Sequence, residues 1–388
     1  MQISSRFNPN LYFYLLIASV CSFLLSLFLL QLFVGALSIL WILDKFSEKK
    51  KAFDTFGKVI FIFLAVRIIS ILFSSYPGDS NQAYYKDALF YFGFFSFDFY
   101  LKALDKKRIK ITAYSFAAAA AAIALIGLVR FNLSLVERAQ SFSSGYATFS
   151  SYLLAGFGVL VCLRIDIKKG LIIKTVSAAL IFSAVITSLG RTNIAAILVL
   201  FIAAFFLKKI NLKEASIIIL LTIIFSAISF YNNSVEANAR MEQPASLSDR
   251  DILLKGTKDL FLEFKSPLLG YGPRTFKDVF PYKKMLTDKG IGSWHNDFIQ
   301  IYFESGILGL GSFLLIIIVS YYFLIKLLKN RTDNNYKMIL WGVLLGLSGL
   351  IISALTAGFI DSPVLSLVFA FLISLLSGIE YLVKPAES

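Results

Sequence analysis

Long apolar stretches separated by short polar segments run along most of the chain. They lie at 11–27, 29–43, 55–74, 84–101, 111–129, 147–164, 170–187, 192–207, 214–231, 306–328, 338–357 and 362–382. Most have the length that crosses a bilayer as an α-helix, roughly 17–25 residues. Because they are continuous rather than alternating, they favour helices over the strands of a transmembrane barrel. The pattern predicts an all-α polytopic membrane protein with about 12 transmembrane helices.

Composition supports this prediction. Of 388 residues, 57% are hydrophobic and only 16% are charged, whereas soluble domains have roughly 25% charged residues. A soluble enzyme, a disordered chain and a fibrous protein are thereby excluded. We expect residues 1–388 to form a single integral membrane domain, in which the alanine run 117–122 packs closely against a neighbouring helix. The first apolar stretches are too long for a cleavable signal peptide.

The polar loops alternate in charge, which predicts the topology. One set contains basic runs such as DKFSEKKK, DKKRIK and KKINLK, and the N-terminal Arg6 and C-terminal Lys384 fall on the same side. Short basic loops stay cytoplasmic, so both termini are expected in the cytoplasm and residues 232–305 form a large outward-facing loop. The formal charge of +14 is spread over these loops. It is therefore interpreted as a topology signal, with no nucleic-acid partner.

The outward loop begins with a predicted amphipathic helix. Ser248 and Asp251 resemble a capping box at its start. Apolar or small residues then recur at spacings of three and four: Leu253, Gly256, Leu260 and Phe264. Ser266-Pro267 ends the helix, and a glycine-rich turn at 270–273 follows.

Arg250 lies in the first turn of that helix, between two acids. It could pair with Asp249 or Asp251, or its guanidinium could bind a phosphate in a bidentate manner. Asp249 and Asp251 also resemble a metal-binding pair, but Arg250 between them would oppose a divalent cation and a helix would direct the two carboxylates to different sides.

His295 is the only histidine. Ile299, Tyr302, Gly306 and Gly309 follow it at helical spacing, so we expect His295 on one stripe of a helix that continues into the span 306–328. A neutral imidazole near a helix N-terminus could act as a general base. It could equally be a hydrogen-bonded residue at the membrane interface.

Arg191 lies at the outer end of the span 192–207. Free backbone N–H groups at a helix N-terminus would make it part of an anion site, and an interfacial anchor is the alternative. Three further ionisable residues lie at predicted outward positions: Arg138, Arg274 and Asp361. Their sequence context does not indicate a specific role. Arg67 lies deep in a span, so we expect it to have a charged partner. Cys21 and Cys162 allow no disulfide framework and no cysteine–histidine metal cluster.

Taken together, these segments resemble the O-antigen ligase/polymerase superfamily. The resemblance rests on His295-Asn296, an apolar helix and Glu304-Ser-Gly306-x-x-Gly309, on Arg250 with the later SPLLGYG, and on Arg191 before an alanine-rich helix. It covers the whole topology, although Arg274 replaces the small residue that is usual after the glycine turn.

The resemblance implies a glycosyltransferase of the bacterial inner membrane whose active site faces the periplasm. It implies an inverting, metal-independent transfer, with no cofactor, from an undecaprenyl-diphosphate-linked glycan donor. His295 would activate the acceptor, and Arg191 and Arg250 would bind the diphosphate. The remaining possible substrate-binding residues are Arg138, Arg274, Asn296 and Glu304.

Two acceptors are compatible with this signature, and the ligase is favoured. A ligase uses lipid A–core, whereas a polymerase uses a second lipid-linked repeat unit. Arg138 before a Ser/Gly-rich loop and the single long outward segment favour the ligase. A transporter of polyprenyl-linked glycans and a metal-dependent transferase using Asp249 and Asp251 are the more distant alternatives.

Overall fold

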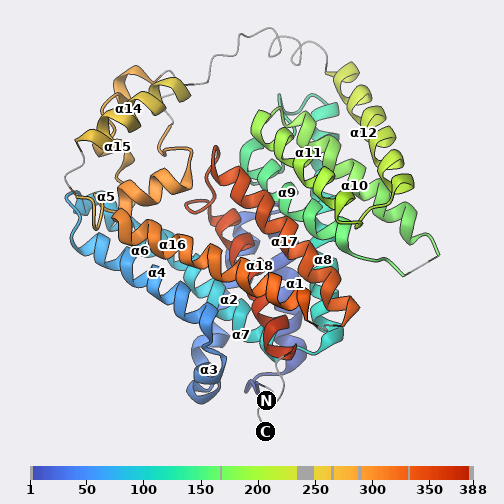
Figure 1. Ribbon diagram of the computed structural model, residues 1–388, viewed down its shortest axis with the longest axis horizontal. Helices are drawn as coiled ribbons and strands as arrows, with labels where there is room; N and C mark the ends of the chain where they lie inside the picture. The colour runs from blue at the N-terminus through green and yellow to red at the C-terminus, as the bar shows by residue number, and fades with distance from the viewer. Residues whose placement is uncertain are drawn as a thin grey trace.

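The computed structural model describes residues 3–166, 168–233, 249–263, 266–286, 291–330 and 333–383. Every regular element within these ranges is a helix (Figure 1). In chain order they are α1 (Pro9–Ser22), α2 (Leu27–Leu43), α3 (Phe46–Ala52), α4 (Thr55–Leu72), α5 (Pro77–Ser80), α6 (Gln82–Lys86), α7 (Ala88–Ala103), α8 (Lys106–Asn132), α9 (Tyr146–Cys162), α10 (Gly170–Thr187), α11 (Arg191–Phe206), α12 (Leu212–Asn232), α14 (Arg250–Leu262), α15 (Phe276–Val279), the 3₁₀ turn η1 (Lys283–Met285), α16 (Asp297–Lys329), α17 (Asn334–Ala354) and α18 (Pro363–Val383). The all-α prediction is confirmed for this part of the chain.

Each predicted apolar stretch falls mainly on one helix, although 84–101 also covers the end of α6, and these helices differ in length. Within the described ranges, seven are long and apolar enough to cross a membrane: α4, α8, α10, α12, α16, α17 and α18. The pair α2 and α3 meets the same test but is bent by 111°, and α1, α9 and α11 are shorter apolar helices. The chain is therefore a multi-span membrane protein, and the figure of about 12 crossings stays a prediction.

Helices α9 and α18 form the centre of the bundle, because nearly all their residues are buried. They pack most extensively against α17 and α7. Small residues permit this closeness: a Cβ on Gly158 would lie 2.4 Å from the nitrogen of Gly346, and one on Gly156 would lie 2.2 Å from Ala120 Cβ. Ala117 is buried on the same helix as Ala120, so the alanine run packs as expected.

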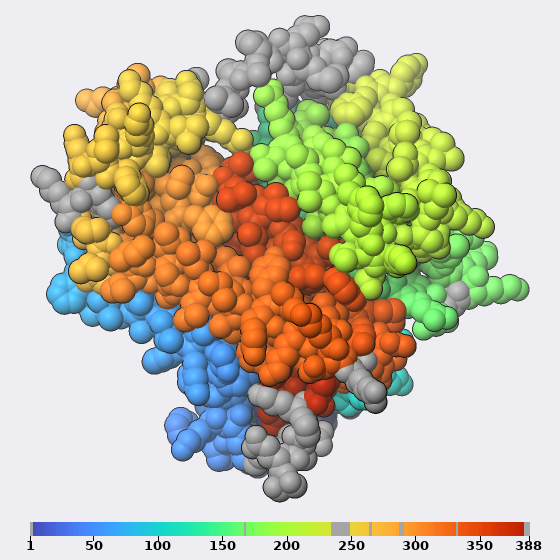
Figure 2. Space-filling view, in the orientation of Figure 1, coloured from blue at the N-terminus to red at the C-terminus, as the bar shows by residue number. Residues whose placement is uncertain are grey.

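The two ends of the chain lie together, whereas α14 and α15 lie at the opposite end of the molecule (Figure 1). The space-filling view shows the α14 segment, in yellow, resting over the start of α16, in orange (Figure 2). This arrangement separates the chain ends from the segment that carries the candidate chemistry.

A small apolar core of its own holds the α14 segment together. It comprises Leu253, Leu260, Phe276, Phe280, Leu286, Trp294 and Phe303. Gly256 is buried with Leu253 and Leu260 on one face of α14, which confirms the predicted amphipathic helix. The N-cap is Asp249, which makes no side-chain capping bond to the helix. Ser248 and Phe264 lie outside the described residues. The predicted capping box and the predicted place of Phe264 on the apolar face are therefore not tested.

Candidate active site

The segment after α14 is joined to α16 through backbone hydrogen bonds. The donor and acceptor pairs are Tyr271 N to Phe303 O (2.8 Å), Gly272 N to Glu304 O (3.0 Å) and Ile307 N to Pro267 O (2.8 Å). These bonds form at a kink in α16, where Gly306 has φ 64° and ψ −165°. Backbone groups on either side of the kink thus bind residues 267–272 instead of only their own helix.

We predict that Gly306→Ala destabilises the protein by at least about 1–3 kcal/mol, the usual cost of a strained backbone conformation. A Cβ at this position would also lie 2.2 Å from the carbonyl carbon and oxygen of Leu268. Thermal unfolding of the purified protein in detergent measures the loss. Gly311→Ala is the matched control, because nothing lies within 4 Å of its Cβ position. Equal melting temperatures for Gly306→Ala and wild type would contradict this role of the kink.

A buried charge network lies beside the kink, around Arg67 of α4. Its Nη1 donates to Glu304 Oε2 at 2.7 Å and its Nη2 donates to Asp87 Oδ2 at 2.9 Å. Asp361, before α18, lies 3.8 Å from Nη2. Because the Arg67 and Glu304 side chains are only 3% and 1% exposed, each needs the other in this environment. The expected partner of Arg67 is thus confirmed.

Arg274 and Gln300 complete the same network. The Arg274 guanidinium donates to Asp87 Oδ1 at 2.7 Å, and its backbone N–H donates to Glu304 Oε1 at 2.9 Å. Gln300 donates to Glu304 and to Asp361. Burial, followed by the nearby carboxylate of Asp87, raises the pKa of the Asp361 carboxyl, as expected where three carboxylates share two guanidinium groups. Both oxygens of Glu304 are therefore engaged within the protein.

His295 precedes α16 rather than belonging to it. The helix begins at Asp297, and Asn296 is its N-cap, whose side-chain oxygen accepts from Phe298 N and Ile299 N. His295 itself has φ 49°, a left-handed conformation that histidine adopts more readily than most residues. The expectation that His295 shares a helical stripe with Ile299 is therefore wrong, because the Asn296 cap turns the chain one residue after the histidine. Its half-buried imidazole remains beside the helix N-terminus.

The connection between α17 and α18, residues 355–362, brings His295-Asn296 and Arg250 together. Asn296 Nδ2 donates to the carbonyl of Leu355 at 3.1 Å, and Arg250 Nη2 approaches the adjacent carbonyl of Thr356 at 3.4 Å. The guanidinium of Arg250 is exposed. It therefore lies next to the His-Asn pair and remains accessible to an anion.

Asp297 also holds the connection between α17 and α18 in place. Its carboxylate is buried and accepts from Phe359 N at 2.6 Å and from Ile360 N at 3.2 Å. Asp297 was not among the predicted site residues. The signal that could have found it is its position in the motif, directly after His295-Asn296 and at the end of a polar run.

Arg191 is held near the end of α17 by a chain of hydroxyl and amide groups. It is the first residue of α11 and is exposed. Two residues later, Asn193 Nδ2 donates to Ser150 at 2.6 Å and to Ser151 at 3.2 Å, and Ser151 hydrogen-bonds Ser353 of α17 at 2.5 Å. Ser353 lies just before the α17–α18 connection. The N-terminus of α11, whose first N–H groups have no partner within the helix, thus lies at the same end of α17 as Arg250.

Arg138 lies in the loop before α9 and is tied to this region. Ala139 N donates to Thr187 O at 3.1 Å, at the end of α10 just before the turn that leads to Arg191. The Arg138 guanidinium lies 4.0 Å from the ring centroid of Tyr146, a cation–π contact. Its Nε is buried and has no hydrogen-bond partner among the described residues. Arg138 therefore adds positive charge near the α11 N-terminus.

The predicted residues thus divide into two groups. Arg191, Arg250, His295 and Asn296 lie toward the end of α17, with Arg138 near the start of α11, whereas Arg274 and Glu304 lie in the charge network. Asp87 and Gln300 of that network were missed, although an acid inside the stretch 84–101 was a usable signal. Within the described ranges, no group of three or more histidine, cysteine, aspartate or glutamate side chains could hold a metal ion.

Comparison with known families gives a match within the chain. Residues 176–314 match the family model described as O-antigen ligase. The match supports a relationship of this region to the O-antigen ligase/polymerase superfamily. The matched region runs from α10 into α16 and contains Arg191, Arg250, Arg274, His295 and Glu304. It covers less than half of the chain. No curated protein matches the chain. The matched family is associated with membrane glycan-processing enzymes.

Proposed function

We propose that the protein is an O-antigen ligase of the bacterial inner membrane. It transfers a glycan from an undecaprenyl-diphosphate carrier to a sugar hydroxyl of lipid A–core on the periplasmic side. The observation that carries this proposal is the convergence of Arg191, Arg250 and His295-Asn296 on the end of α17. Two exposed guanidinium groups suit a diphosphate. The position of both chain ends at the opposite end of the molecule supports cytoplasmic termini.

In the proposed reaction the acceptor hydroxyl oxygen attacks the anomeric carbon from the face opposite the diphosphate. The new glycosidic bond forms while the bond from that carbon to the diphosphate oxygen breaks, so the configuration inverts. His295 takes the hydroxyl proton. Arg191 and Arg250 stabilise the negative charge that develops on the leaving diphosphate. All groups required for this sequence are side chains of the protein, and no step uses a metal ion.

The test of the ligase assignment is deletion of the gene in its host and reintroduction of the wild type. Lipopolysaccharide is then compared on gels with the polyprenyl-linked glycan pool. We expect the deletion strain to show core without O-antigen and long chains on the carrier, and the wild-type gene to restore the ladder. Core capped by a single repeat unit would instead identify a polymerase, and an unchanged ladder would exclude both.

Replacing either arginine with lysine is expected to lower transfer at least about tenfold, because an ammonium group keeps the charge but loses the bidentate fork. The variants are Arg191→Lys and Arg250→Lys, assayed with purified protein, lipid-linked donor and lipid A–core. The control is Arg164→Lys, whose exposed side chain pairs with Asp166 in the α9–α10 loop and should transfer at the wild-type rate. Wild-type rates in both site variants would contradict the diphosphate role.

A further inference from the structure

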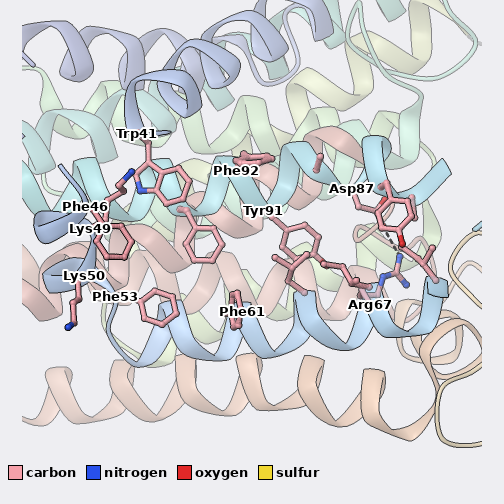
Figure 3. A pocket seen from close by; sticks show the side chains of 17 residues that line it. Trp41, Phe46, Lys49, Lys50, Phe53, Phe61, Arg67, Asp87, Tyr91 and Phe92 are labelled. Carbon is pink, nitrogen blue, oxygen red and sulfur yellow. Dashed lines mark hydrogen bonds and ion pairs between the residues drawn. The ribbon is translucent and has the colours of Figure 1, made fainter. Parts of the chain in front are cut away.

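A groove between α2, α3, α4, α6 and α7 lies away from the end of α17 and meets the charge network only at Arg67 and Asp87. It encloses a cavity of about 650 Å³, within the range of ligand sites, roughly 300–1,000 Å³. Its walls are mainly aromatic: Trp41, Phe53, Phe61, Tyr91, Phe92 and Phe95. Figure 3 shows these rings extending along α4 and α7. Phe61 and Phe92 are 53% and 43% exposed, so the groove is open on its outer side.

The two ends of the groove differ in charge. Lys49 and Lys50 of α3 lie at one end, and Arg67 with Asp87 lies at the other (Figure 3). Lys49 lies 5.2 Å from the ring of Trp41, and Lys50 is exposed. The guanidinium of Arg67 is already bound to Asp87 and Glu304. Lys49 Nζ also donates to the carbonyl of Ile42 at 2.9 Å, so neither lysine is paired with a carboxylate among the described residues, and the uncompensated positive charge lies at the α3 end.

We propose that this groove binds an anionic phospholipid, with its headgroup phosphate at Lys49 and Lys50 and an acyl chain between α4 and α7. Helix α3 is bent 111° from α2, which suits a basic segment at a membrane surface. The bound lipid belongs to the membrane leaflet on the α3 side, which is also the side of the chain ends (Figure 1). The carboxylate of Asp87 at the far end disfavours a phosphate there. The proposal does not rest on the ligase assignment.

Lipid binding to the full-length purified protein tests this inference. Native mass spectrometry with added phosphatidylglycerol or phosphatidylcholine measures the bound fraction of each lipid. We expect a preference for phosphatidylglycerol, and we expect Lys49→Gln/Lys50→Gln to reduce it about 25-fold, since each of the two lysines near a lipid surface contributes roughly fivefold. Ala88→Phe, which fills the groove wall, should reduce binding of this lipid without removing the lysines.

The matched control is Lys168→Gln/Lys169→Gln, an adjacent exposed pair outside the groove, which should retain the wild-type preference. Thermal unfolding identifies any variant that fails to fold, and Lys50→Gln alone then replaces the double variant. Equal binding of both lipids by the wild type, or an equal loss in the control, would overturn the proposal. Undecaprenyl phosphate binding that is lost in Ala88→Phe but kept in Lys49→Gln/Lys50→Gln would assign the groove to the carrier chain instead.

Discussion

Replacing His295 with glutamine is expected to lower glycan transfer by about 10²–10⁴-fold, the usual contribution of a positioned general base. Glutamine can still donate and accept hydrogen bonds at this position, but its amide does not take up a proton near neutral pH. The Asn296 cap and the Asp297 carboxylate stay in place, so the start of α16 should be unchanged. Initial rates of the purified enzyme with lipid-linked donor and acceptor measure the loss.

Asp251→Asn is the matched control for this experiment. Asp251 is exposed in the first turn of α14, one residue after Arg250, and the proposed metal-independent reaction does not use it. We expect the wild-type rate and no effect of a chelator. Full activity of His295→Gln would eliminate the base assignment, whereas loss of activity in Asp251→Asn together with sensitivity to chelator would favour the metal-dependent transferase.

Glu304→Ala is expected to destabilise the protein by about 3–5 kcal/mol, the cost of removing one partner from a buried ion pair. The substitution leaves the Arg67 guanidinium without its shortest contact and removes the acceptor of the Arg274 backbone N–H. Thermal unfolding in detergent, read by intrinsic fluorescence, measures the change. The loss should appear whether or not donor is present, because the predicted effect is on folding.

The control for Glu304 is Asp166→Ala, which removes the partner of Arg164 in an exposed pair with 78% and 53% exposed side chains. Surface pairs of this kind contribute about 0–1 kcal/mol. If Glu304→Ala kept the wild-type melting temperature but raised the KM for donor, the prediction of a substrate contact for Glu304 would be favoured over the structural role described above.

The membrane helices were predictable because their signal is local. In an apolar run such as 170–187, the side chains face lipid or neighbouring helices, and the backbone hydrogen bonds form within the run itself. The bounds predicted for that run agree with α10, Gly170–Thr187. The amphipathic face of α14 was equally local, since Leu253, Gly256 and Leu260 follow helical spacing.

The surroundings of His295 and Arg67 were not predictable, because they depend on contacts between distant segments. Helical spacing after His295 gave no indication that Asn296 would cap α16 and leave the histidine at positive φ. Arg67 required a partner, but Glu304 lies 237 residues away. Only the packing of α4 against α16 selects this acid from the others in the chain.

The kink at Gly306 affects which residues around the site can change as the sequence diverges. Residues 267–272 are attached to α16 by main-chain hydrogen bonds. The main side-chain requirement for this attachment is that positions 270 and 306 remain glycine, because a Cβ at either position would clash with the opposite backbone. Leu268, by contrast, is 62% exposed. Outward side chains of this segment can therefore change to accommodate a different sugar while Glu304 and the start of α16 keep their positions.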